Sequence, residues 1–236
     1  MTESPAPAFR PPRHASKQDI RRELRERRAD RARDRAAADA DDAALARTFL
    51  AAAEPSSGPM SVHTPPGEPS SGGLPVHNRT GVVAVYLSRT GEPGTGALRT
   101  ALAGRGVRLL LPWLREDRDL DWVVDPGPAA LPGAPMRPPG ERLGHRAAER
   151  ADVLLIPALA VDTAGRRLGQ GGGSYDRVLE RLAEAPLAQR PLAVACVHDD
   201  EVLEARLHPL PEEPHDRRVD AVLTPTRWLV VPTRSG

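Results

Sequence analysis

The chain has 236 residues, a formal net charge of +1 and one cysteine. A charge this close to zero excludes a global field that would draw the protein to nucleic acid or to a membrane surface, and a single cysteine excludes a disulfide within the chain. With no apolar stretch near the length of a membrane span and no signal-peptide core, the sequence predicts a soluble cytoplasmic protein that binds neither nucleic acid nor a membrane.

The first 80 residues divide by composition into three segments. Residues 1–15 are rich in proline and small residues, which predicts a disordered tail. Residues 17–53 contain neither proline nor glycine, which predicts one or two helices with Ser16 as the N-cap. Residues 54–80 carry many breakers and no periodicity, which favours a disordered insertion. We therefore expect a single domain over residues 16–230, interrupted at about 54–80.

The first predicted helix is rich in arginine. Eight arginines lie between residues 21 and 35, and acidic residues interleave with them. A solvated, salt-bridged face explains this pattern better than an RNA-binding helix, which stays an alternative. Among all 33 basic residues only Lys17 is a lysine.

Apolar runs and helix-compatible stretches alternate beyond residue 80. The predicted strands are residues 81–88, 106–114, 151–162, 191–198 and 219–226, and the predicted helices are residues 95–104, about 141–150 and about 174–185. Continuous apolar runs separated by helices predict an α/β fold of three layers, with a mainly parallel sheet and helices on both faces. Trp122 and Cys196 lie in apolar runs and are predicted to be buried. In such sheets ligands bind beyond the carboxyl ends of the strands.

A glycine tract stands between the third strand and the helix that follows it. The sequence "RRLGQGGGSYDRVL" at residues 166–179 has glycine at 169 and at 171–173. Bare N–H groups at a helix N-terminus suit phosphate oxygens, and Arg166 or Arg167 could add charge. Neither the P-loop nor the dinucleotide-binding spacing is present, so a purely structural glycine loop is an equal alternative.

Three carboxylates lie where they could meet a ligand. Asp176 in the first turn of the predicted helix either complements the helix dipole or holds Mg²⁺ on bound phosphates. A second magnesium ligand is expected nearby, and Asp216 or Asp220 before the last strand could supply it. Glu92 follows the first strand and either starts a helix or contacts the substrate.

Four stretches in order resemble the family of 5-formyltetrahydrofolate cyclo-ligases, also called methenyltetrahydrofolate synthetases. They are "KQDIR", "YLSRTGEPGT", "PALAVDTAGRRLGQGGGSYDRVL" and "LPEEPHDRRVDAVLT", which together span most of residues 17–226. The resemblance implies a three-layer α/β fold related to ribose-phosphate isomerases and CoA-transferases. It also implies conversion of 5-formyltetrahydrofolate to 5,10-methenyltetrahydrofolate with cleavage of ATP to ADP and phosphate.

The resemblance assigns roles to individual residues. It implies that Leu87, Glu92 and Tyr175 contact the folate, that Asp176 and Asp216 hold Mg²⁺, and that Arg167 and Tyr175 are catalytic. The implied ATP-binding residues are Lys17, Arg21, Arg167, Gly169, Gln170, Gly171, Gly172, Gly173, Ser174 and Tyr175. The implied partners are 5-formyltetrahydrofolate and ATP, and we expect a monomer.

Two positions depart from the family pattern. Ser174-Tyr175 replaces a pair of tyrosines, and Arg137-Pro138 stands where many relatives have Glu-Pro. A non-catalytic relative that binds nucleotide or folate is therefore the alternative function.

Overall fold

The computed structural model describes residues 9–12, 15–54, 81–127, 131, 133–184, 190–214 and 216–232. Most of the predicted tail and of the predicted insertion at 54–80 lies outside the described residues. Among the described helices, none combines the length and the apolar character needed to cross a membrane.

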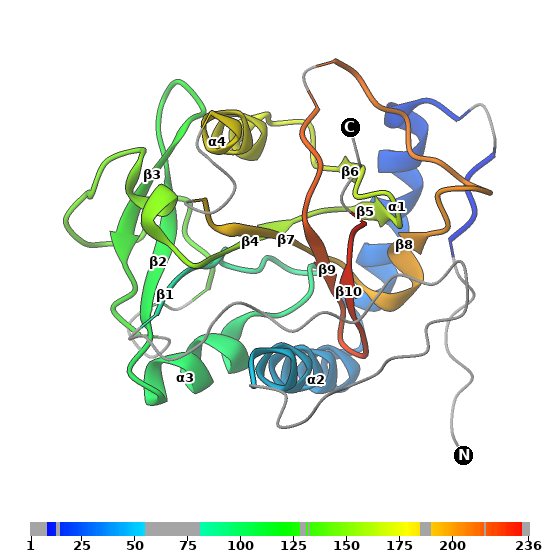
Figure 1. The fold of residues 1–236 in the computed structure, drawn as a ribbon. Coiled ribbons are helices and arrows are strands. Elements are labelled where there is room, and N and C mark those ends of the chain that lie inside the picture. Colours follow the sequence, from blue (N-terminus) through cyan, green and yellow to red (C-terminus); the bar gives the residue numbers. More distant parts are fainter. Residues whose placement is uncertain are drawn as a thin grey trace, which may run out of the picture.

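A seven-stranded sheet in the order β10-β9-β7-β4-β1-β2-β3 forms the middle of the molecule (Figure 1). Its strands are β1 (Val82–Ala84), β2 (Arg108–Leu114), β3 (Leu120–Val124), β4 (Val153–Pro157), β7 (Leu192–Cys196), β9 (Ala221–Leu223) and β10 (Trp228–Val230). The five central strands run parallel, and only the edge strands β3 and β10 pair antiparallel with their neighbours. The predicted mainly parallel sheet is confirmed.

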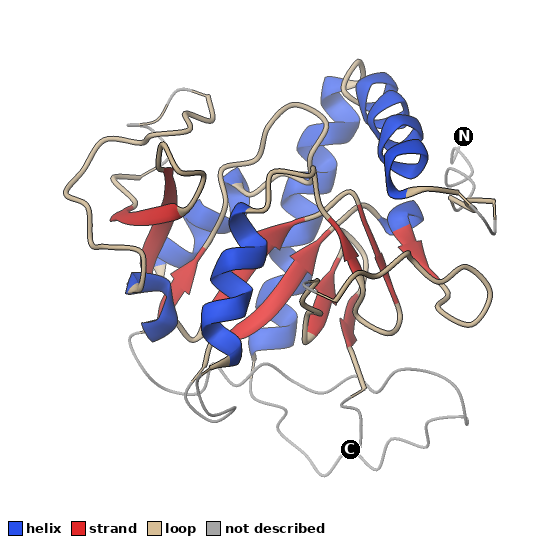
Figure 2. Cartoon of the chain, turned by 90° about the horizontal axis from the view of Figure 1, so that it is seen from above, coloured by secondary structure: helices blue, strands red, loops and turns tan. Residues whose placement is uncertain are grey.

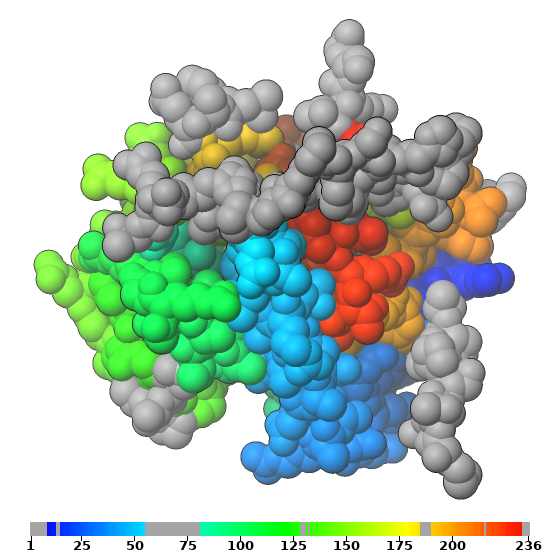
Figure 3. Space-filling model, turned by 60° about the horizontal axis from the view of Figure 1, so that its bottom comes forward, coloured from blue at the N-terminus to red at the C-terminus, as the bar shows by residue number. Residues whose placement is uncertain are grey.

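Helices cover both faces of this sheet, so the predicted three layers are confirmed (Figures 1 and 2). Helices α2 (Arg35–Ala53) and α3 (Gly96–Gly104) lie side by side on one face, as Figure 3 also shows, and helix α4 (Ser174–Ala183) lies on the other. Two separate apolar clusters fill the two interfaces. Trp122 and Cys196 are fully buried, as expected.

A second, three-stranded sheet adjoins helix α1 (Lys17–Arg31). Its order is β6-β5-β8, from β5 (Ala160–Asp162), β6 (Arg167–Leu168) and β8 (Val202–Leu203). Ile20 and Leu24 of α1 share an apolar cluster with residues of this sheet. The predicted N-cap is also confirmed, because the Ser16 hydroxyl accepts a hydrogen bond from the Asp19 backbone N–H at 3.2 Å.

Three predictions of secondary structure were wrong in detail. The helix expected at 141–150 is only a 3-10 turn at Ala147–Arg150, because Gly144 has a φ of +90° that a right-handed helix cannot contain. The apolar run 151–162 is two strands, β4 and β5, which belong to different sheets. The short strands β3, β6, β8 and β10 were not predicted, because their runs are brief and border polar segments.

The arginine-rich helix is only partly a solvated face. Arg28 is 5% exposed and its guanidinium forms two hydrogen bonds of 2.7 Å with the carboxylate of Glu201, which is 1% exposed. Burial opposes the charged guanidinium, but its bonds to Glu201 outweigh this, and the pKa of Arg28 is raised. A pair such as Arg33 with Asp30 is exposed, as expected. The helix therefore has one buried, charged attachment point.

Glu201→Gln should destabilise the protein by about 3–5 kcal/mol, because it leaves the buried Arg28 charge without its partner. Urea denaturation measures the free energy of unfolding. The control is Asp30→Asn, which removes an exposed partner of Arg33 and should change little. Equal small effects of both substitutions would contradict the structural role of the buried pair.

Candidate functional site

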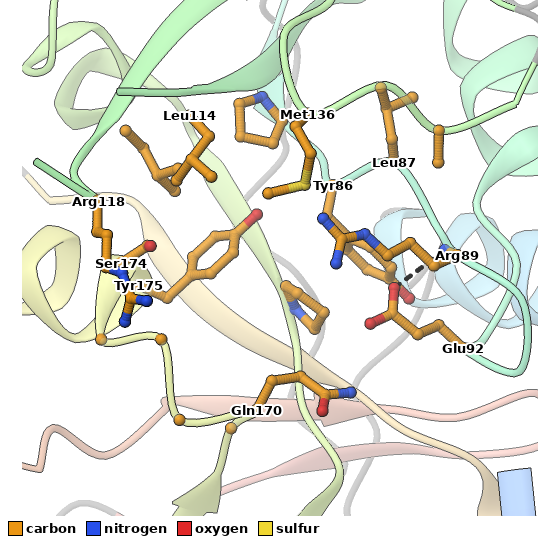
Figure 4. A pocket seen from close by; sticks show the side chains of 18 of the residues that line it. Tyr86, Leu87, Arg89, Glu92, Leu114, Arg118, Met136, Gln170, Ser174 and Tyr175 are labelled. Carbon is orange, nitrogen blue, oxygen red and sulfur yellow. Dashed lines mark hydrogen bonds between the residues drawn. The ribbon is translucent and has the colours of Figure 1, made fainter. Parts of the chain in front are cut away.

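An apolar cleft of about 530 Å³ opens beyond the carboxyl ends of the parallel strands. Tyr86 and Leu87 follow β1, Leu114 ends β2 and Pro157 ends β4, and all four line the cleft. Figure 4 shows Tyr175 projecting into its middle between Leu114 and Glu92. The cleft lies at the edge of the sheet where the fold class predicted a ligand.

The glycine tract forms a loop between β6 and α4. Gly171 and Gly173 have φ values of +91° and +75°, which side-chain-bearing residues rarely adopt. Gly173 is the N-cap of α4 and supplies no side-chain cap to the first turn. The N–H groups at the start of α4 therefore remain available to an anion.

Helix α1 holds this loop through two arginines. Arg21 Nε donates to the carbonyl of Gly169 at 2.9 Å. Arg25 donates to the side-chain oxygen of Gln170 at 3.0 Å and to its carbonyl at 2.9 Å. The loop carbonyls thus bond to α1.

A second, charged cleft of about 690 Å³ lies on the other side of the glycine loop. Six residues with predicted roles line it, namely Lys17, Arg21, Gly171, Gly173, Asp176 and Asp216. Gly171, Gly173 and Asp176 line both clefts. The glycine loop is therefore a wall shared by an apolar cleft and a charged one.

The predicted phosphate ligands and the predicted metal ligands form ion pairs with one another. Lys17 Nζ lies 2.6 Å from Asp216 Oδ2 and 3.4 Å from Glu213. Arg167, whose side chain is 4% exposed, forms an ion pair with Asp176. The site's charges are thus nearly balanced within the protein.

Asp176 and Asp216 fit a magnesium ion that rides on phosphates. Both are hard oxygen donors, and both line the charged cleft. The described residues contain no group of three or more His, Cys, Asp or Glu that could form a cage around a metal. Mg²⁺ typically uses one or two carboxylates and takes its other ligands from phosphates and water.

Tyr175 presents an unpaired hydroxyl. Its hydroxyl oxygen is buried and has no hydrogen-bond partner among the described residues. Burial, and then the charge of Glu92, raise the pKa of Tyr175 far above its usual value, so the hydroxyl keeps its proton. By contrast, the Tyr86 hydroxyl donates to the carbonyl of Pro93 at 2.7 Å. Tyr175 therefore offers a free donor to a ligand in the apolar cleft.

Glu92 lies in the wall of the apolar cleft on a loop that α1 supports. Its carboxylate accepts from the backbone N–H of Arg89 at 3.0 Å. Gly91 has a φ of +83°, and a Cβ there would lie 2.9 Å from the carbonyl oxygen of Arg28. Close packing of the loop against α1 therefore fixes the position of Glu92.

Sequence reasoning missed about half of the residues that line the apolar cleft, among them Arg89, Arg118 and Met136. Arg89 stands inside the family-like stretch "YLSRTGEPGT", which could have identified it as a site residue. Arg118 and Met136 lie outside the four family-like stretches, so no such signal pointed to them. Ser174, which replaces a family tyrosine, also lines the cleft. Arg137 does not, since its guanidinium lies over the Trp113 ring at 4.8 Å from the centroid.

Fold and geometry together define an α/β protein with a two-part ligand site beyond the carboxyl ends of its parallel strands. Residues 73–225 match the model of the 5-formyltetrahydrofolate cyclo-ligase family, and the chain belongs to this family of enzymes. The chain is 41% identical to the 5-formyltetrahydrofolate cyclo-ligase of Mycolicibacterium smegmatis, over 63% of this chain and 75% of the relative. It is 38% identical to that of Escherichia coli over 33% of this chain and 38% of the relative.

Two solved structures share the fold. The 5,10-methenyltetrahydrofolate synthetase of Aquifex aeolicus has a TM-score of 0.60 at 22% identity and covers 93% of this chain and 95% of its own. That of Mycoplasma pneumoniae has a TM-score of 0.59 at 15% identity and covers 89% and 99%. The three-layer α/β fold that the resemblance implies is confirmed.

Tyr175→Phe should leave the free energy of unfolding unchanged or raise it by up to about 1 kcal/mol, because it removes a buried hydroxyl that has no partner among the described residues. Urea denaturation without ligands measures this. Tyr86→Phe is the matched control and should lose about 1 kcal/mol, since it leaves the Pro93 carbonyl unpaired. A clear loss for Tyr175→Phe would show that its hydroxyl is satisfied in the free protein.

Proposed function

We propose that the chain catalyses the ATP-dependent cyclisation of 5-formyltetrahydrofolate to 5,10-methenyltetrahydrofolate, with release of ADP and phosphate. The observation that carries this proposal is the shared wall: one glycine loop borders an apolar cleft and a charged cleft. An aromatic substrate in the apolar cleft and a polyphosphate in the charged cleft would be separated only by the backbone of this loop.

The apolar cleft suits the folate. Leu87 and the Tyr175 ring supply apolar contacts, and Glu92 offers a carboxylate acceptor for the N–H groups of a pterin. The Tyr175 hydroxyl has no partner in the part of the chain that the structure describes, so it can donate to the formyl oxygen without losing another bond there.

The charged cleft suits the phosphates of ATP. Lys17 and Arg21 line it, and the start of α4 adds backbone N–H groups and a positive helix end. Asp176 and Asp216 would hold Mg²⁺. When bound, the ion would neutralise charge on the phosphate oxygens.

The chemistry requires positioning more than a protein nucleophile. The formyl oxygen attacks the γ-phosphorus, and the bond from that phosphorus to ADP breaks. N10 then attacks the formyl carbon, the carbon–oxygen bond breaks, phosphate leaves with that oxygen, and N10 loses its proton. Arg167 lines the apolar cleft and pairs with Asp176, which lines both clefts, and a cation at this place would stabilise the transferred group.

The proposal is tested by adding 5-formyltetrahydrofolate, ATP and Mg²⁺ to the purified protein. Near-ultraviolet absorbance follows methenyltetrahydrofolate, and a coupled assay follows ADP. We expect both products in equal amounts, each dependent on both substrates. Nucleotide and folate binding without turnover would instead support the non-catalytic alternative.

Asp216→Ala should lose most of the activity while the protein remains folded, because one of two predicted magnesium ligands is removed. Activity is measured against Mg²⁺ concentration, and circular dichroism checks the fold. Glu213→Gln is the control, since Glu213 also lies near Lys17 but has no predicted metal role. Normal turnover of Asp216→Ala at limiting Mg²⁺ would show that the metal assignment is wrong.

Lys17→Ala should raise the KM for ATP by a factor equivalent to about 1.5–3 kcal/mol, as expected for a lost hydrogen bond from a charged group. Lys17→Arg should restore only part of this, because the guanidinium is larger and differently shaped. ATP saturation curves measure both variants. Coincident curves for Lys17→Ala and the wild type would remove Lys17 from the ATP site.

A further inference from the structure

Arg118 lies in the apolar cleft and has no role in the proposed reaction. It stands at the tip of the β2–β3 hairpin and lines the cleft. Its guanidinium forms no hydrogen bond or ion pair with any residue that the structure describes. In Figure 4 its side chain extends from the hairpin toward Ser174.

The hairpin turn explains the backbone of Arg118 but not its side chain. Its φ of 66° makes it the one non-glycine residue with a left-handed φ in the described part of the chain. The turn is closed by hydrogen bonds from Arg115 N–H to the Asp119 carbonyl, at 2.9 Å, and from Arg118 N–H to the Arg115 carbonyl, at 3.2 Å. Glycine or asparagine takes this conformation at lower cost than arginine. Strained residues of this kind cluster at ligand sites.

Helix α4 fixes the tip on both sides of Arg118. Arg181 forms two hydrogen bonds with the carboxylate of Asp119, at 2.8 and 3.1 Å. Arg177 donates to the carbonyl of Asp117. Since α4 begins at the glycine loop, these contacts hold Arg118 in a defined place relative to the site.

The carboxylates nearest to Arg118 in the chain are already engaged. Asp119 is bonded to Arg181, and Asp117 accepts from Arg115 Nε at 3.2 Å. The unpaired charge of Arg118 is therefore available to a ligand. The guanidinium of Arg89 also makes no ion pair with a described residue, but it lies beside Glu92, whose carboxylate accepts from the Arg89 backbone N–H at 3.0 Å (Figure 4).

The two ends of the cleft differ in charge. Glu92 lies at one end and Arg118 at the other, with Tyr175 between them (Figure 4). A carboxylate such as Glu92 favours the N–H donors of a pterin and repels the two carboxylates of a glutamate. The exposed Arg118 at the opposite end attracts them.

We propose that Arg118 binds a carboxylate of the glutamate tail of 5-formyltetrahydrofolate at the mouth of the apolar cleft, an inference that rests on the proposed function. It would make Arg118 a specificity-determining residue that distinguishes substrates with a glutamate tail from those without one.

The test compares 5-formyltetrahydrofolate with 5-formyltetrahydropteroate, which lacks the glutamate. Arg118→Gln should raise the KM for 5-formyltetrahydrofolate about tenfold or more and leave kcat and the KM for ATP unchanged. With the pteroate substrate, the variant and the wild type should behave alike. Arg118→Gly should reproduce the loss without lowering the melting temperature, because glycine accepts the turn freely. Arg105→Gln, at an exposed position outside the clefts, is the control.

Two results would overturn the proposal. One is an unchanged KM for 5-formyltetrahydrofolate in both Arg118 variants. The other is an equal fall of kcat with both folate substrates, which would mean that Arg118 acts on the transferred phosphoryl group instead.

A wild-type protein that forms no product would refute the proposed function, and equilibrium binding would then test Arg118 by itself. Quenching of tryptophan fluorescence by 5-formyltetrahydrofolate and by the pteroate compound gives the affinities. Weaker binding of only the glutamate-bearing compound to Arg118→Gln supports the proposal, and equal affinities for wild type and variant overturn it.

Discussion

The buried ion pair between Arg28 and Glu201 attaches helix α1 to the segment that enters β8. A buried charge is tolerated only when its hydrogen bonds are made, and here both side chains make further hydrogen bonds. Arg28 also donates to the carbonyl of Ala158, and Glu201 also accepts from the backbone N–H of His198. From this attachment α1 supports the glycine loop through Arg21 and packs against the loop that carries Glu92. Displacing α1 would therefore disturb both clefts at once.

The balance of charge around the glycine loop has a consequence for the proposed reaction. Lys17 pairs with Asp216, and Arg167 pairs with Asp176. ATP without Mg²⁺ would draw the cations from their carboxylates and leave those carboxylates beside the phosphates. Mg²⁺ without ATP would leave the cations beside the metal. When ATP and Mg²⁺ bind together, the cations can pair with the phosphates and the carboxylates can pair with the metal. The proposed site therefore couples the binding of nucleotide to the binding of metal.

The sequence allowed the central sheet and the location of the candidate site to be predicted, because long apolar runs and a glycine tract are local signals. The division of residues 151–162 between two sheets could not be predicted, since it depends on where β5 finds its partners β6 and β8. The burial of Arg28 was hidden for a similar reason: its partner Glu201 lies 173 residues away. Arg118 was missed because the turn that positions it and the helix that holds it are far apart in the chain.

The glycine tract was open to two interpretations, a phosphate-binding loop and a purely structural loop. In the structure its glycines differ in what requires them. Gly171 and Gly173 have positive φ values, so the course of the loop alone accounts for them. At Gly169 a Cβ would lie 2.8 Å from Arg167 Nη1. Gly172 has neither constraint, since an added Cβ would meet only the Ser174 hydroxyl at 4.0 Å and would otherwise point into open space. Because packing and backbone geometry do not require a glycine there, the close approach of a ligand to the loop is the remaining physical reason for one.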